Sequence, residues 1–179
     1  MNAGAEQSRL RDRLAEGTRG EIGNATEIAR EIIAFPGLLH ALLELLDDPD
    51  GLVVSHGAHA AMQVSLDRPE LFREQVDRLL DLLERSPHWE IGEQLPKILA
   101  VQDLSGAQLA RFRALLERKL GGRSAIAAAS ALSALVDLAA RGAIDADVAM
   151  KAHDAALHSP SKALAARARQ LEARVRLLG

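Results

Sequence analysis

Four leucines recur at a constant interval of 37 residues along this chain, at Leu46, Leu83, Leu120 and Leu157. A fixed period of roughly 20 to 50 residues is typical of stacked supersecondary units, each of which buries its apolar face only against its neighbours. The apolar positions before the first two leucines superpose at the same offset: Phe35, Leu39, Leu42, Leu43, Leu45 and Leu46 match Phe72, Val76, Leu79, Leu80, Leu82 and Leu83. The sequence therefore predicts a repeated helical unit.

A second series with the same spacing predicts the other helix of each unit. It consists of Val64, Val101, Leu138 and Val175, beside a column of small residues at Gly57, Ala131 and Ala168. In the segment 88–102 the strict offset would place Glu90, Gln94 and Lys97 in apolar columns. Burying an unpaired Glu and Lys costs several kcal/mol, so we expect a one-residue insertion that brings Ile91, Leu95 and Ile98 inward instead.

The composition favours an all-α fold. Apolar residues make up 48% of the 179-residue chain and aromatic residues only 2%, so the strand-forming aromatic types are scarce. With no cysteine there is no disulfide, thiol nucleophile or thiolate zinc site. No apolar stretch has the length and flanks of a signal peptide or a membrane span, and we therefore expect a cytoplasmic protein with no membrane association.

Helix-end signals divide the chain. The pairs Asp48-Pro49, Ser86-Pro87 and Ser159-Pro160 each combine an N-cap residue type with a proline expected at the first helical position, and Gly121-Gly122 is expected to end a helix with left-handed backbone angles. Capping-box spacing occurs at 67–70 and 105–108, and 142–145 indicates a stop followed by a new cap. The predicted helices span 5–16, 21–34, 36–47, 50–66, 69–85, 88–102, 106–120, 124–141, 146–158 and 161–178.

Two helices per unit, prolines at the joints, Pro96 inside a first helix and the apolar columns make the chain resemble the HEAT-repeat family, with armadillo repeats as near neighbours. The usual Asp and Arg of that repeat are not regularly present. The resemblance implies a right-handed α-solenoid of about four hairpins whose second helices line the concave face, where family members hold proteins or, less often, nucleic acid. We expect one domain over 1–179, with an N-terminal cap at 1–18, hairpins over 20–160 and a capping helix at 161–179.

The second helices are expected to present a charged row opposite their apolar side. This row, the ridge, consists of His40, Glu44, Glu74, Asp77, Asp81, Arg111, Arg118 and Lys151. Its charge passes from acidic to basic along the chain, and residues 44–93 hold 12 acidic and 4 basic side chains. A separated charge pattern is suited to a partner with a complementary pattern. The alternative interpretation is an ordinary solvated face with helical ion pairs such as Glu74 with Arg78.

The other groups of potentially reactive side chains do not indicate an enzyme. His56 and His59 are three residues apart, but two ligands are too few for a metal, and Trp89 shares an apolar column with Leu52, Ile126 and Ala163. We assign these residues, and Ser124, Ser130 and Ser133, to packing. We therefore expect no metal, no cofactor and no catalysis.

A non-catalytic protein-binding adaptor or regulatory scaffold is the predicted function, with the partner and the oligomeric state left open. The alternative is a HEAT-like DNA-binding protein or a DNA glycosylase acting on duplex DNA. Basic residues in 111–123 and 162–176 would supply the phosphate contacts. The negative net charge, the single tryptophan and the absence of tyrosine weigh against nucleic acid.

Overall fold

The computed structural model describes residues 3–19 and 21–179, and within this part of the chain the structure is helical with no β-strand. The α-helices are α1 (Ala3–Leu14), α2 (Ala25–Ala34), α3 (Leu39–Glu44), α4 (Gly51–Asp67), α5 (Val76–Arg85), α6 (Trp89–Leu99), α7 (Gly106–Leu120), α8 (Ala125–Ala140), α9 (Ala146–Leu157) and α10 (Lys162–Arg176). Three 3-10 helices, η1 (Pro36–Leu38), η2 (Leu45–Asp47) and η3 (Pro69–Gln75), extend α3 at both ends and precede α5. Every predicted helix is therefore present, with ends that differ by a few residues. The expected N-terminal cap and hairpin ranges include residues 1, 2 and 20, which lie outside the described part.

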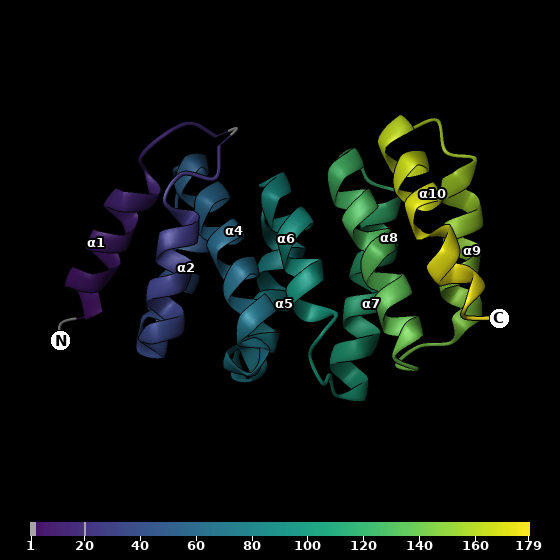
Figure 1. Ribbon diagram of the computed structural model, residues 1–179, viewed down its shortest axis with the longest axis horizontal. Helices are drawn as coiled ribbons and strands as arrows, with labels where there is room; N and C mark the ends of the chain where they lie inside the picture. Colours follow the sequence, from purple (N-terminus) through teal and green to yellow (C-terminus); the bar gives the residue numbers. More distant parts are fainter. Residues whose placement is uncertain (1–2, 20) are drawn as a thin grey trace.

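The helices follow one another along the long axis of the molecule, with the two chain ends at opposite ends of the row (Figure 1). The even-numbered helices α2, α4, α6, α8 and α10 each pack against the next one. Helices α3, α5, α7 and α9 form the other row and pack against even-numbered helices, for example α7 and α9 against α8. Helix α1 lies at the N-terminal end of the molecule and packs against α3 and α4 (Figure 1). The chain thus forms two rows of helices.

Small residues allow the even row to pack closely. A Cβ atom placed on Gly92 of α6 would lie 2.9 Å from the Cβ of Ala127 in α8, which is closer than two such atoms approach in proteins. Gly57, Ala131 and Ala168 are all buried, as the column of small residues predicts. In the odd row, α3 and α5, like α7 and α9, approach each other much less closely, whereas α1 lies close to α3 and α5 to α7.

The core runs through both rows, and the 37-residue leucines contribute to it. Leu46 and Leu83 are fully buried, and Leu120 and Leu157 are half-buried and packed against the core. Residues of α8 face two apolar clusters: Leu135 and Leu138 belong to the larger one with α1–α7, and Leu132 belongs to the smaller one with α9 and α10. The core is therefore built between successive helices and not around one centre.

Two expected core positions are wrong. Phe72 is fully buried, but Phe35 is 63% exposed. Helix η3 begins three residues before Phe72, whereas η1 begins one residue after Phe35, so the two rings emerge from different backbone conformations. Val101 is 47% exposed because α6 ends at Leu99.

The expected insertion in α6 is only partly right. Ile91, Leu95 and Ile98 are buried as predicted, but Glu90 and Gln94 are buried as well. Gln102, and not Val101, turns inward, and its amide donates to the carbonyl of Pro69 at 3.2 Å. Helix α6 packs against α4 and α8 of its own row and against α5 of the other row. Residues on several sides of α6 are therefore buried.

Some of the helix-end predictions are confirmed and others are wrong. Ser105 and Gln108 form the predicted capping box, and Asp145 caps α9 after Gly142, whose φ is +70°. The residues before the prolines do not cap the helices directly. Asp48, Ser86 and Ser159 accept from the backbone N–H two residues later, and the helices begin after Asp50, His88 and Ser161. These side chains therefore form Asx and Ser turns before the helices, and each proline lies outside its helix.

Two further caps are wrong. Gly121 ends α7 with φ −84° and has no left-handed conformation, and Gly122 also lacks a positive φ. No capping box forms at 67–70, where Glu70 pairs with Arg68.

Candidate functional site

The eight ridge residues all lie on the odd row or its 3-10 extensions. His40 and Glu44 come from α3, Glu74 from η3, Asp77 and Asp81 from α5, Arg111 and Arg118 from α7, and Lys151 from α9. All are exposed except Arg111, which is half-buried. The predicted exposure of this row is therefore present.

Ion pairs across helices engage four of the eight ridge residues, namely Glu44, Asp81, Arg111 and Arg118. Arg78 of α5 lies 2.8 Å from Glu44, and not against Glu74 as the i,i+4 spacing suggested. Arg111 contacts Asp81 at 2.8 Å, and Gln108 donates to Asp77 at 2.9 Å. These contacts join α3 to α5 and α5 to α7.

Glu84 is a ridge residue that the sequence analysis missed. Its two carboxylate oxygens accept from Arg111 at 2.6 Å and from Arg118 at 2.9 Å, which holds the pKa of Glu84 below its ordinary value. The seven-residue spacing of the two arginines was the available signal, because it places both on one face of α7. Lys151 shares a shallow hollow with Arg113 and Glu117 and has no ion pair within the described residues.

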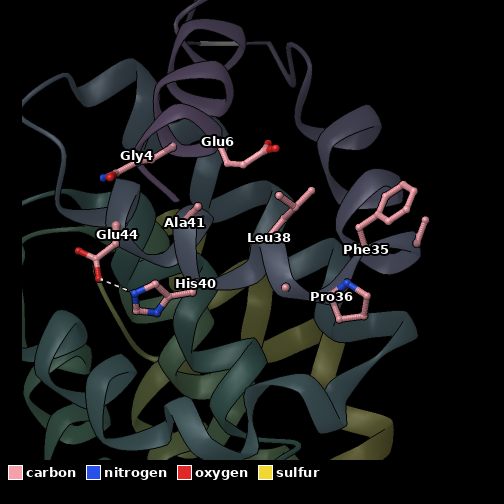
Figure 2. A pocket seen from close by; sticks show the side chains of 11 residues that line it. Gly4, Glu6, Phe35, Pro36, Leu38, His40, Ala41 and Glu44 are labelled. Atoms are coloured by element: carbon pink, nitrogen blue, oxygen red, sulfur yellow. Dashed lines mark ion pairs between the residues drawn. The ribbon is translucent and has the colours of Figure 1, made fainter. Parts of the chain in front are cut away.

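A mainly apolar hollow of about 640 Å³ lies at the N-terminal end of the two rows, beside the first ridge residues. Figure 2 shows Gly4 and Glu6 of α1 on one side of it, with Phe35, Leu38 and His40 on the other. His40 lies 3.5 Å from Glu44 at its edge. This N-terminal hollow adds an apolar surface to a ridge that was predicted from charge alone.

A second, smaller hollow of about 260 Å³ lies on the even row between α4, α6 and the segment that joins α1 to α2. We call it the Trp89 hollow. Trp89 lines it and is 38% exposed, so it is not packed at the helix start as expected. His59 lines it as well, and its burial, together with the positive charge of Lys97, lowers the pKa of His59 below 6.5.

Glu90 beside this hollow is buried and forms a two-pronged pair with Arg19. The Nε and Nη2 atoms of Arg19 donate to the two carboxylate oxygens of Glu90 at 2.6 and 3.0 Å. Burial of Glu90 was not predicted, because a carboxylate in an apolar column needs a partner, and Arg19 lies 71 residues earlier in the chain.

His56 contacts backbone carbonyls of the N-terminal part of the chain. The ring nitrogens of His56 lie 2.8 Å from the carbonyl oxygen of Leu14 and 3.2 Å from that of Thr18. Both nitrogens are therefore engaged by the end of α1 and the segment after it. No group of three metal-ligating side chains occurs within residues 3–19 and 21–179. The serines likewise make local contacts: Ser124 caps α8, and Ser130 and Ser133 donate to backbone carbonyls.

Several basic residues proposed as phosphate contacts are paired with carboxylates. Arg113 contacts Glu117 at 2.8 Å, Arg176 contacts Glu172 at 2.5 Å, and Arg174 contacts Asp137. Lys119 is half-buried, and its burial lowers its pKa.

Comparison with known proteins returns no match to this chain among family models, curated proteins or solved structures. In the described part of the chain, no helix combines the length and apolar character that a membrane crossing requires.

Proposed function

We propose that this chain is a non-catalytic protein-binding scaffold, built as a HEAT-like right-handed α-solenoid. The observation that carries the proposal is the sequential packing of the helices in two rows, because such an arrangement provides long open faces for a macromolecular partner. The exposed Phe35 ring in the N-terminal hollow supports it, since exposed apolar patches rimmed by polar residues are typical of interaction sites.

The packing of the even row bears on which face is concave. In a curved stack of two rows, the row with the closer helices lies on the inner side. The close approach of α6 to α8 at Gly92 therefore favours a concave face formed by α4, α6, α8 and α10. The family resemblance favours the second helices instead, so the ridge and the even row are the two faces to be compared.

The partner-binding role of the ridge can be tested by reversing the charges of Asp77 and Asp81 to arginine. Both side chains are exposed, and their contacts with Gln108 and Arg111 lie at the surface, where such a pair contributes about 0 to 1 kcal/mol. The melting temperature should therefore fall only slightly, whereas capture of a partner from the native lysate should fall strongly. Quantitative mass spectrometry of the captured proteins is the measurement. Reversing Asp12 and Glu27, which are exposed and lie outside the ridge, is the matched control.

Two outcomes would count against these proposals. Unchanged capture by the Asp77 and Asp81 variant would remove the ridge as the binding surface. Failure of the unmodified chain to enrich any protein over bare resin would contradict the scaffold itself.

A DNA-binding or DNA glycosylase function is the alternative, favoured by the meeting of His59, Trp89 and carboxylates in the Trp89 hollow. Its two buried or half-buried carboxylates are already engaged, Glu90 by Arg19 and Glu93 by Lys97 at 3.5 Å. A mobility shift of duplex DNA that weakens steeply with salt would support this alternative over the scaffold.

A further inference from the structure

Glu90 breaks the pattern of its own column. The residues at the same offset in α4, α8 and α10 are Val53, Ala127 and Leu164, and all three are buried. The side chain of Glu90 is only 3% exposed. A buried ion pair is on average no more stabilising than well-packed apolar side chains, so packing gives no reason for a carboxylate here. A position that breaks a local rule in this way is a candidate for function.

The cation that pairs with Glu90 comes from a weakly buried segment. Arg19 is 49% exposed and lies between α1 and α2, where the described residues 16–19 and 21–23 are all exposed. Gly17 and Gly23 have φ of +91° and +53°, conformations that side chains rarely adopt. The carboxylate is therefore fixed on a packed helix, while its partner is carried by the least buried part of the structure.

The hollow around this pair has a charge that suits one cationic side chain. Apart from Arg19, its charged lining residues are Glu21, Glu90, Glu93 and Lys97, which together are negative. The space beside Arg19 is about 260 Å³, below the range of about 300 to 1,000 Å³ typical of sites for drug-sized ligands. Trp89 adds an exposed aromatic ring, on which a guanidinium group stacks well.

We propose that the Trp89 hollow is a binding site for an arginine side chain of a partner protein, and that Arg19 occupies this site in the isolated chain. The partner's guanidinium would donate to both oxygens of Glu90 and displace the side chain of Arg19. This proposal rests on the protein-binding function proposed above and names the chemistry of one contact.

The test uses N-acetyl-L-argininamide as the probe and Trp89 as the reporter, because Trp89 is the single tryptophan of a chain without tyrosine. The Arg19→Ala variant should bind the probe with a saturable change in fluorescence, at least about tenfold more tightly than the unmodified chain, since a charge-assisted pair is then available. The corresponding citrulline amide, which has the same shape but no charge, is the matched control. Thermal melts establish that each variant is folded.

Glu90→Gln in the Arg19→Ala background should abolish the response. Arg19→Lys keeps a cation but loses the two-pronged geometry, so it should give intermediate affinity and serves if Arg19→Ala does not fold. An equal response to the citrulline amide, retention of binding by the double variant, or no response in either folded Arg19 variant would overturn the proposal. Because no partner protein is used, none of these results depends on the scaffold function, and a failed lysate capture would not explain them.

Discussion

Leu83 shows how closely a single residue follows from the repeat. It occupies the second position of the 37-residue leucine series and is fully buried in the main apolar cluster. Leu83→Ala should lower the free energy of unfolding by about 2 to 5 kcal/mol, because it removes buried methyl groups and leaves a cavity. Chemical denaturation gives the value.

Leu66→Ala is the matched control for this truncation. Leu66 also lies in a helix, but it is 72% exposed, so its replacement should change stability by less than about 0.5 kcal/mol. Equal effects of the two substitutions would show that the leucine series does not form the core.

At other residues the 37-residue repeat did not predict burial correctly. Phe35 and Phe72 have the same place in the repeat, yet the start of the local 3-10 helix differs by four residues relative to the ring and leaves Phe35 exposed. Glu90 was expected outside the core because an unpaired carboxylate is costly there. The cost argument is sound, but Arg19 provides the pair that the local sequence does not reveal.

At the scale of elements, α1 is attached to α2 through Glu31. This carboxylate accepts from Arg9 at 2.6 Å and from Arg13 at 2.5 Å. The hydrogen bond from Arg9, with a further one from Arg13, holds the pKa of Glu31 below its ordinary value despite partial burial. A carboxylate whose pKa is lowered in the folded state stabilises that state above its unfolded pKa, and the stabilisation is lost as the pH falls through the folded pKa.

Glu31→Gln should therefore lower the melting temperature most at neutral pH. The difference from the unmodified chain should shrink as the pH is lowered from about 6 toward 3, because Glu31 is then increasingly protonated in both states. Melting curves across this pH range provide the measurement. Glu27→Gln, an exposed position on the same helix, should show no such convergence, and a constant difference for Glu31→Gln would contradict the assignment.

At the scale of the whole molecule, the last two helices form a separate layer of the core. The smaller apolar cluster joins α8 to α9 and α10, while the larger cluster runs from α1 to α8. If stability is distributed along the rows, a chain ending at residue 141 should remain helical and unfold cooperatively. Its denaturant m-value should be lower by about a fifth, in proportion to the residues removed.

Circular dichroism during urea titration measures both quantities for the shortened chain. Leu132→Ser in the shortened chain should improve its solubility, because Leu132 becomes exposed to solvent when α9 and α10 are removed. If the shortened chain is unfolded in buffer, the two apolar clusters form one cooperative core.

The sequence alone determined the all-helical class, the number and order of the helices and most of the buried columns. These properties follow from helical periodicity and from helix-end signals, both of which act within a few residues. Tertiary structure decided the pairing of Glu90 with Arg19, the exposure of Phe35 and the ion pairs that join ridge residues such as Glu44 and Arg111 to neighbouring helices. Each of these depends on which distant side chains meet and how closely the rows approach, and a period in the sequence carries no information about either.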